Sequence, residues 1–189
     1  HDRQLRQNMI ADIAHELRTP LSVIQGNLEA MLDGVLPANP QEIASLHDET
    51  TLLSRLVADL RLLSLAEAGQ LKLERAETDL GDLIWRTTDA MRPQADAAAI
   101  RLEADLPPNL PRISLDADRI SQVIRNLVAN ALRHTPAGGS VSVRAFSNQQ
   151  ASQNKPAVVV EVTDTGSGIA PEDLPFVFER FYRVAKDRS

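Results

Sequence analysis

The chain has 189 residues, 43% of them hydrophobic and 24% charged, so it is large and apolar enough for one large domain or two small ones. Its net charge of −6 argues against a broad nucleic-acid-binding surface, which needs a basic patch. The absence of cysteine excludes disulfides and thiolate metal sites. No apolar run approaches the roughly 18 residues of a membrane span, and no signal peptide is evident. Because the first residue is His, we expect the sequence to be a piece of a longer chain.

The first segment, residues 1–68, has the pattern of two amphipathic helices. Apolar residues recur three or four positions apart from residue 5 to residue 32. The stretch 34–40 holds two prolines, a glycine and an asparagine, which interrupt the first helix. The second helix is expected to begin near Pro40. Three of its leucines have the seven-residue spacing of a coiled-coil seam: Leu46, Leu53 and Leu60.

Two such helices joined by a short loop predict an antiparallel helical hairpin. One hairpin cannot bury two wide apolar stripes, so we expect two copies to pair into a four-helix bundle, which makes the protein a homodimer. The alternative is a hairpin that packs against the rest of its own chain. Gly69 is the expected helix stop and hinge, and residues 69–189 are expected to form a second domain.

Beyond Gly69 the pattern changes to mixed helix and strand. Alternating apolar and polar residues, and one run with four valines, predict strands at 71–74, 100–106, 113–115, 140–146 and 157–162. Helices are predicted between them, over 81–96 and from a cap at Asp116 to about His134. The polar stretch 147–155 is a predicted hairpin loop.

The first helix places a histidine beside a carboxylate. His15 and Thr19 are four positions apart and share a helix face. Pro20 leaves the carbonyl of Glu16 without its helical hydrogen bond, so we expect a local bend. Neutral imidazole is a good nucleophile near neutral pH, and a carboxylate such as Glu16 can hold the proton of the other ring nitrogen. His15 is therefore a candidate nucleophile; the alternative is a solvated His-Glu pair on a helix surface.

The helix that ends near His134 has a polar flank. Asn126, Asn130, Arg133 and His134 follow one another at i, i+4, i+7 and i+8. Asparagine is a poor residue for a helix interior, so two of them one turn apart suggest amide oxygens with a ligand. Oxygen ligands suit Mg²⁺, which bridges phosphates, and Arg133 can offset phosphate charge. The alternative is two solvent-facing asparagines. Apolar packing is expected from two neighbouring residues: Val123 and Ile124.

The valine-rich strand ends in an acidic residue and a Gly-x-Gly turn. Asp164 at such a strand end can accept a hydrogen bond from an exocyclic amine, and Gly166 and Gly168 let the backbone approach a ligand closely. The pattern is neither the dinucleotide fingerprint nor a Walker loop, because no third glycine and no Gly-Lys-Ser/Thr follow at the required spacing. The alternative is an ordinary tight turn.

Aromatic residues gather near the C-terminal end. Four of the six aromatic residues of the chain fall within seven positions: Phe176, Phe178, Phe181 and Tyr182. In so aromatic-poor a chain they suggest an anchor that ties a mobile segment to the core or grips a partner. The alternative is a plain core plug.

Together these segments closely resemble the bacterial sensor histidine kinase family. The His15 segment looks like the family's H box, 126–134 its N box, 164–168 its G1 box and 178–182 its F box, in the family's order and spacing. The resemblance covers nearly the whole chain. It implies a dimerisation and histidine-phosphotransfer domain, followed by an ATP-binding two-layer α/β sandwich of the kind shared with type II topoisomerases, mismatch-repair ATPases and heat-shock chaperones.

The resemblance implies an enzyme, a protein histidine kinase. His15 would attack the γ-phosphate of ATP with Glu16 as proton acceptor or orienting base, and the phosphate would pass to an aspartate of a response regulator. Thr19, in the His-Glu-x-x-Thr pattern, would position water for dephosphorylating the regulator, a phosphatase activity. The implied ligands of Mg-ATP are Asn130 with Asn126 for Mg²⁺, Arg133 and His134 near the phosphates, Asp164 for adenine, and Gly166 and Gly168 beside the nucleotide.

The sequence departs from the family pattern at its end. A second glycine-rich box should follow the F box, and the sequence stops at Ser189 before any such motif, so we expect the ATP lid to be missing here. Impaired use of ATP would leave a dimerising, regulator-docking scaffold as the alternative function. An ATPase or chaperone on the same nucleotide fold would not need a histidine on a dimeric hairpin. The resemblance also implies the cytoplasmic portion of a membrane-anchored sensor, without nucleic acid or direct membrane contact.

Overall fold

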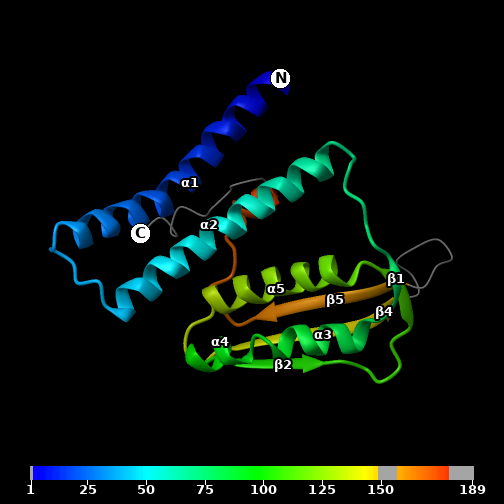
Figure 1. Ribbon diagram of the computed structural model, residues 1–189. Helices are drawn as coiled ribbons and strands as arrows, with labels where there is room; N and C mark the ends of the chain where they lie inside the picture. Colours follow the sequence, from blue (N-terminus) through cyan, green and yellow to red (C-terminus); the bar gives the residue numbers. More distant parts are fainter. Residues whose placement is uncertain (1, 149–156, 179–189) are drawn as a thin grey trace. The chain divides into compact units, whose positions relative to one another are not determined.

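A computed structural model describes residues 2–148 and 157–178 of the chain (Figure 1). The chain divides into two compact units, His1–Lys72 and Leu73–Ser189. The first is a helical hairpin and the second combines helices with a mixed sheet, which confirms the predicted fold class.

The hairpin consists of α1 (Asp2–Leu32) and α2 (Pro40–Glu67), and these two helices pack against each other. Asn39 caps α2, since its side-chain oxygen accepts a hydrogen bond from the backbone nitrogen of Glu42 at 2.9 Å. Pro40 takes the first helical position, where a missing N–H leaves no helical bond unmade. The predicted start of the second helix is thus confirmed.

A proline and a glycine mark irregular points of the hairpin. Pro20 lies inside α1, and Figure 1 shows the axis of this helix changing direction along its length, as a proline inside a helix favours. At the far end, Gly69 follows α2 with φ of +64°, the left-handed conformation that glycine adopts at low cost. The predicted helix stop at Gly69 is confirmed.

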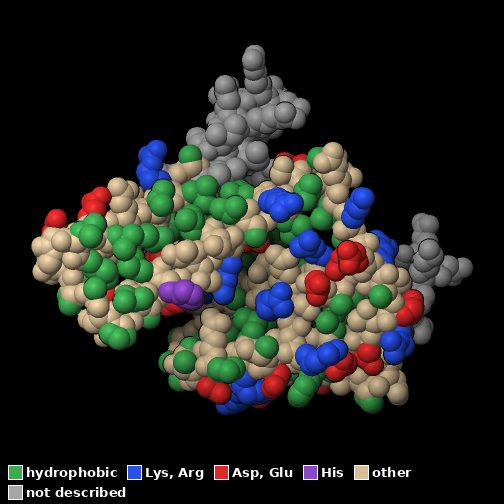
Figure 2. All heavy atoms as spheres, viewed as in Figure 1, with side chains coloured by type: hydrophobic (Ala, Val, Ile, Leu, Met, Phe, Trp, Pro, Cys, Tyr) green, Lys and Arg blue, Asp and Glu red, His purple; other side chains and the backbone are tan. Residues whose placement is uncertain are grey.

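Apolar side chains of both helices remain at the surface of the hairpin. Every described residue of α2 is at least partly exposed. Figure 2 shows hydrophobic side chains spread over this part of the surface. The large exposed ones include Leu21, Leu28, Leu32, Ile43, Leu52 and Val57. One copy of the hairpin therefore does not bury its own apolar stripes.

The second unit is a two-layer α/β sandwich. Its strands are β1 (Ala76–Asp79), β2 (Arg101–Asp105), β3 (Arg112–Leu115), β4 (Ser140–Asn148) and β5 (Ala157–Asp164). Its helices are α3 (Leu80–Asp89), α4 (Arg92–Ala97), α5 (Ala117–His134) and the short 3₁₀ helix η1 (Leu174–Phe176). Helices α3 and α5 lie side by side over the sheet (Figure 1).

The strands form two small sheets. In the order β2-β4-β5, β2 runs parallel to β4 and β4 runs antiparallel to β5, with Val141 opposite Asp164. Strands β1 and β3 form a separate antiparallel pair. The core lies between the larger sheet and its two helices, and its largest fully enclosed apolar side chains are Ile84, Val128, Val141 and Val143. This packing holds the end of β5 beside the end of α5.

One predicted strand is wrong. Residues 71–74 are not a strand, and β1 begins at Ala76, which pairs with Leu115 of β3. The alternating pattern is real, but the partner strand decides which residues pair. Glu74 instead donates its backbone N–H to the carboxylate of Asp116.

One predicted helix is divided. The expected helix over 81–96 ends as α3 at Asp89 and resumes as α4 at Arg92. Pro93 explains the break, because it has no N–H to donate to the carbonyl of Asp89 four residues earlier.

The remaining elements agree with the sequence. Four strands and one helix match their predicted positions: β2, β3, β4, β5 and α5. Ser147 and Asn148 still belong to β4, and the rest of the predicted loop, 149–156, lies outside the described residues. β5 is half-buried over its valines, since it lies at the edge of the described sheet.

Candidate functional site

The helix α5 begins at a carboxylate with two separate roles. Asp116 accepts a hydrogen bond from the backbone nitrogen of Arg119 at 3.1 Å, which caps the helix. Its second oxygen accepts one from the backbone nitrogen of Glu74 at 3.0 Å. These bonds, the Arg119 bond foremost and then the Glu74 bond, lower the pKa of Asp116 because they stabilise its charged form. One side chain therefore starts α5 and holds the segment that precedes β1.

The two faces of α5 differ as the predicted polar flank requires. Its buried residues are Ile124, Val128, Ala131 and Leu132. Asn126, Asn130 and Arg133 are exposed on the opposite side, and His134 is half-buried. With a rise of about 1.5 Å per residue, Asn126 and His134 are about 12 Å apart along the helix axis.

The predicted apolar packing of α5 is half right. Ile124 is buried, but Val123 is 52% exposed and Leu127 is 48% exposed. Val123 precedes Ile124 by about 100° around the helix, which takes it off the face that the core covers. The sequence pattern did not separate the two, because both are apolar and adjacent.

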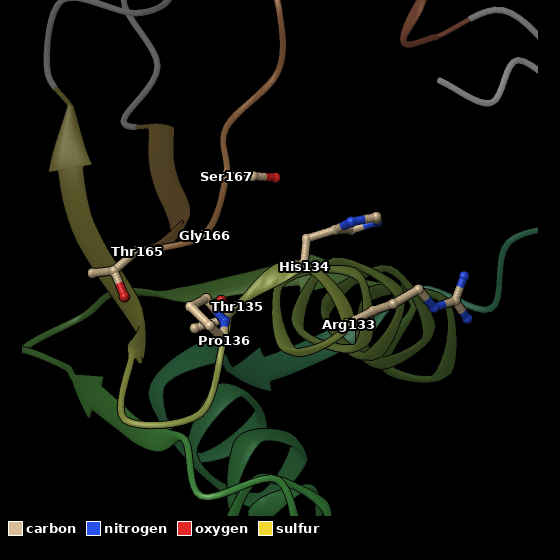
Figure 3. A pocket seen from close by; sticks show the side chains of 7 residues that line it. All are labelled: Arg133, His134, Thr135, Pro136, Thr165, Gly166 and Ser167. Atoms are coloured by element: carbon tan, nitrogen blue, oxygen red, sulfur yellow. The ribbon is translucent and has the colours of Figure 1, made fainter. Parts of the chain in front are cut away.

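A shallow hollow of about 450 Å³ lies where α5 ends beside the end of β5 (Figure 3). In Figure 3 the side chains of Arg133 and His134 extend from the end of α5, and Ser167 extends from the segment after β5. The residues that line the hollow are Arg133, His134, Thr135, Pro136, Thr165, Gly166 and Ser167. Two motifs about thirty residues apart in the sequence thus meet at one place.

The hollow gathers some of the predicted site residues and not others. Arg133, His134 and Gly166 line it. Asp164 and Gly168 stand two residues to either side of Gly166 in the chain. The two asparagines lie one and two turns back along α5, on the exposed flank. Four lining residues were not predicted, although each lies within two positions of a predicted one: Thr135, Pro136, Thr165 and Ser167.

The contact between the two motifs is made by backbone. A Cβ atom on Gly166 would lie 2.3 Å from the carbonyl oxygen of His134 and 2.8 Å from Oδ1 of Asp164. The Gly166 N–H donates a hydrogen bond to that same Oδ1 at 2.8 Å. The glycine therefore lets the turn after β5 close against the end of α5, a role that the sequence pattern does not distinguish from ligand approach.

The H-box residues lie on the other unit. His15 and Glu16 are within α1, and their side chains lie outside the described residues. Thr19, one turn further along, is exposed.

In the C-terminal aromatic group, Phe176 belongs to η1 and Phe178 is 97% exposed, so Phe178 is not a core plug. Phe181 and Tyr182 lie outside the described residues.

The described residues hold neither an acidic metal cluster nor a membrane helix. No group of three or more His, Asp or Glu side chains in residues 2–148 and 157–178 could hold a metal ion. In the same part of the chain, no helix combines the length and hydrophobicity needed to cross a membrane.

Two family models match the chain. Residues 5–69 match the His Kinase A (phospho-acceptor) domain, which includes α1 and α2. Residues 115–189 match the histidine kinase-, DNA gyrase B-, and HSP90-like ATPase family, which includes α5, β4 and β5. The matches thus cover the hairpin and the nucleotide motifs separately.

Curated relatives match over the whole chain. The signal transduction histidine-protein kinase BaeS of Escherichia coli (strain K12) is 37% identical over 188 residues, which is 100% of this chain and 39% of BaeS. The sensor protein SrrB of Staphylococcus aureus is 34% identical over 191 residues, 98% of this chain and 31% of SrrB. The chain therefore spans less than half the length of these relatives.

Two solved structures of histidine kinases resemble the chain in both fold and sequence. The Acinetobacter baumannii histidine kinase AdeS has a TM-score of 0.74 and 34% identity, over 86% of this chain and 78% of that one. Histidine kinase ThkA, solved in complex with the response regulator protein TrrA, has a TM-score of 0.68 and 25% identity, over 93% of this chain and 50% of that one. With its paired phospho-acceptor and ATPase matches, this chain belongs to the sensor histidine kinase family.

Proposed function

We propose that this chain is the phosphorylating core of a two-component sensor: it binds Mg-ATP on the α/β unit, phosphorylates His15 and passes the phosphate to a response regulator. One observation carries the proposal. The end of α5 and the turn after Asp164 line one hollow, and the exposed asparagines Asn126 and Asn130 lie on the same helix. A helical hairpin with a histidine beside a carboxylate precedes it in the chain. Nucleotide and phosphoacceptor thus occupy separate units.

The hollow suits the base of the nucleotide. Asp164 is exposed, and among the described contacts only its Oδ1 has a partner, the N–H of Gly166. Its other oxygen can accept a hydrogen bond from the exocyclic amine of adenine. The carbonyl groups at the C-terminal end of α5 carry partial negative charge, which favours a hydrogen-bond donor there over a phosphate. The base is therefore assigned to the hollow and the phosphates to the flank that leads back along α5.

The flank suits the metal and the phosphates. Asn126 and Asn130 are exposed and one turn apart, so both amide oxygens are accessible from the same side. Oxygen ligands of this kind fit Mg²⁺, which neutralises phosphate charge. Arg133, exposed on the same flank, adds a cation. Asn130 with Asn126 would hold the metal. Arg133 and His134 line the hollow at the end of this flank, and their side chains would contact the phosphates next to the base.

The chemical step is a phosphoryl transfer to imidazole. A ring nitrogen of His15 forms a bond to the γ-phosphorus, the bond from that phosphorus to the bridging oxygen breaks, and ADP leaves with the electron pair. Glu16 takes or orients the proton of the other ring nitrogen. In the second step the N–P bond breaks as an aspartate carboxylate of the regulator attacks the phosphorus.

The hairpin supports two further parts of the proposal, dimerisation and a phosphatase activity. The exposed apolar residues of α1 and α2 support a homodimer in which a second copy covers them as a four-helix bundle. Thr19 is exposed one turn from His15, which supports a phosphatase role in orienting water toward the phosphorylated regulator. The family relationship supports a place on the cytoplasmic side of a membrane-anchored sensor. The alternative, a scaffold that docks a regulator without chemistry, predicts no phosphorylation at all.

The proposal is tested by labelling the full-length protein with Mg-[γ-³²P]ATP. We expect phosphate that is lost in acid and stable in base, and none in His15→Gln. The matched control is His47→Gln, since His47 is a strongly exposed histidine of the same hairpin, 3.8 Å from Asp48. Label that persists in His15→Gln contradicts the assignment of His15, and an unlabelled wild-type protein supports the scaffold. A monomer in sedimentation at micromolar concentration would contradict the homodimer.

A further inference from the structure

Thr165 joins the nucleotide hollow to the first residue of β4. Its backbone N–H donates a hydrogen bond to the carbonyl of Ser140 at 3.1 Å. The backbone N–H of Ser140 donates in return to Oγ1 of Thr165 at 2.9 Å. The hydroxyl also lies 3.4 Å from the Ser140 carbonyl oxygen. The last register pair of β4 and β5 is Val141 with Asp164. The Thr165 side chain extends this pairing by one residue, because it accepts the N–H of Ser140.

Thr165 is exposed, but its hydroxyl lies against the backbone of the turn before β4. A Cβ atom on Gly139 would lie 2.8 Å from Oγ1 of Thr165 and 2.4 Å from Cγ2 of Thr135. Thr135 is itself buried, and its hydroxyl donates to the carbonyl of Ala131 inside α5 at 2.7 Å. Gly139 therefore lies close to both Thr135, which follows α5, and Thr165, which follows β5, while the Thr165 hydroxyl itself bonds to Ser140. Figure 3 shows Thr165 beside the hollow.

Thr165 also lies between the two residues that form the Asp164 turn. Oδ1 of Asp164 accepts the N–H of Gly166 at 2.8 Å, so the carboxylate is oriented by the residue after Thr165. The positions of Asp164 and Gly166, which this hydrogen bond joins, both depend on the position of the Thr165 backbone between them. Asp164 is exposed and its surroundings do not enclose it. The Gly166 bond orients the carboxylate directly, and the bonds of Thr165 to Ser140 fix the backbone between Asp164 and Gly166.

We propose that Thr165 is a positioning residue of the nucleotide site, whose hydroxyl holds Asp164 in the orientation that selects adenine. The proposal rests on the proposed function, in which Asp164 accepts a hydrogen bond from the exocyclic amine. Guanine carries a carbonyl where adenine carries that amine, and a carboxylate held in this direction rejects it. A carboxylate that is free to turn away loses this discrimination.

The test compares nucleotide binding in full-length variants. Thr165→Val keeps the size and branching of the side chain and removes the hydrogen bond, whereas Thr165→Ser keeps the hydroxyl. Dissociation constants of Mg-ATP and Mg-GTP are measured for both and for Thr163→Val, the same change two residues earlier at an exposed position of β5. We expect Thr165→Val to weaken ATP binding about two- to tenfold, the effect of one net hydrogen bond, and to bring the two affinities closer together.

Thr165→Ser and Thr163→Val are expected to keep the wild-type preference for ATP. A Thr165→Val protein that loses ATP and GTP affinity in equal proportion would show a merely structural role and overturn the proposal, as would unchanged binding. If Thr165→Val does not fold, a Thr165→Ser protein that has lost the preference overturns it and one that retains it supports it. A wild-type protein that does not prefer ATP would instead contradict the proposed function itself.

Discussion

Gly166 approaches His134 so closely that a Cβ atom on the glycine would lie 2.3 Å from the histidine's carbonyl oxygen. Favourable contacts between non-bonded heavy atoms begin well beyond this distance, at about 3.5 Å. A backbone carbonyl at the end of a packed helix cannot rotate aside as a flexible side-chain tip can. Any larger residue must therefore push the end of β5 away from α5.

Gly166→Ala is expected to destabilise the α/β unit by about 1–3 kcal/mol, the usual cost of forcing extra atoms into a packed site. It should also weaken Mg-ATP binding, because the two halves of the hollow separate. Chemical unfolding and nucleotide titration measure the two effects. Gly81→Ala is the control, since its Cβ would make ordinary contacts at 3.4 and 3.6 Å. Equal behaviour of the two variants would contradict the close contact.

Two neighbouring threonines of α3 predict opposite changes in stability. Thr88 is 1% exposed, and its Oγ1 has no hydrogen-bond partner among the described residues. Thr88→Val replaces this hydroxyl with a methyl group of similar size and is expected to raise the free energy of unfolding by about 1 kcal/mol.

Thr87 is the matched comparison. Its hydroxyl donates to the carbonyl of Leu83 at 2.7 Å and lies 3.3 Å from Oγ of Ser121 on α5. Thr87→Val should lower the free energy of unfolding by about 1 kcal/mol, because it removes the hydrogen bonds that this buried hydroxyl makes. Urea denaturation of both variants provides the measurement, and changes of the same sign would refute the contrast.

Asp116 predicts a pH-dependent stability with a definite sign. Its pKa is lowered in the folded protein below the ordinary value of 3.8, chiefly by the bond from Arg119 and then by that from Glu74. Its contribution to stability is therefore complete above that ordinary value and is lost as pH falls through the lower folded pKa. Thermal melting across this acidic range should show the midpoint falling in the wild-type protein.

Asp116→Asn separates the two bonds of this carboxylate. The one amide oxygen can still cap Arg119, but the amide nitrogen cannot accept a hydrogen bond from Glu74. We expect the melting midpoint to decrease from wild type to Asp116→Asn to Asp116→Ala. The share of the acid dependence of melting that comes from Asp116 should be absent from both variants. An Asn variant as stable as wild type would mean that the Glu74 bond contributes nothing.

Asn130→Ala is expected to separate ligand binding from stability. Alanine is a better helix former than asparagine, so the stability of α5 should be unchanged or slightly higher. Loss of a metal ligand should weaken Mg-ATP binding by about tenfold or more, given what even outer-shell changes cost a metal site. Asn109→Ala, in an exposed loop of the same unit, is the control. Unchanged nucleotide affinity in Asn130→Ala would remove this residue from the site.

Local patterns predicted the elements whose interactions are local. The helix α5, its Asp116 cap and the Pro40 start of α2 follow from residues three or four positions apart, because helical hydrogen bonds and caps have that reach. Pro93 could have predicted the break between α3 and α4 for the same reason. The exposure of Val123 could not be read this way, since it depends on which face the sheet covers.

The sequence by itself determined the family motifs, the hairpin and the helical flank that carries Asn126 and Asn130. Only the tertiary structure decided how these parts meet. The bonds from Ser140 to Thr165 and from Glu74 to Asp116 join residues 25 and 42 positions apart. Such contacts form when the chain folds back on itself, so they depend on the packing of whole elements. The same packing makes Gly166 a contact point for the α5 backbone.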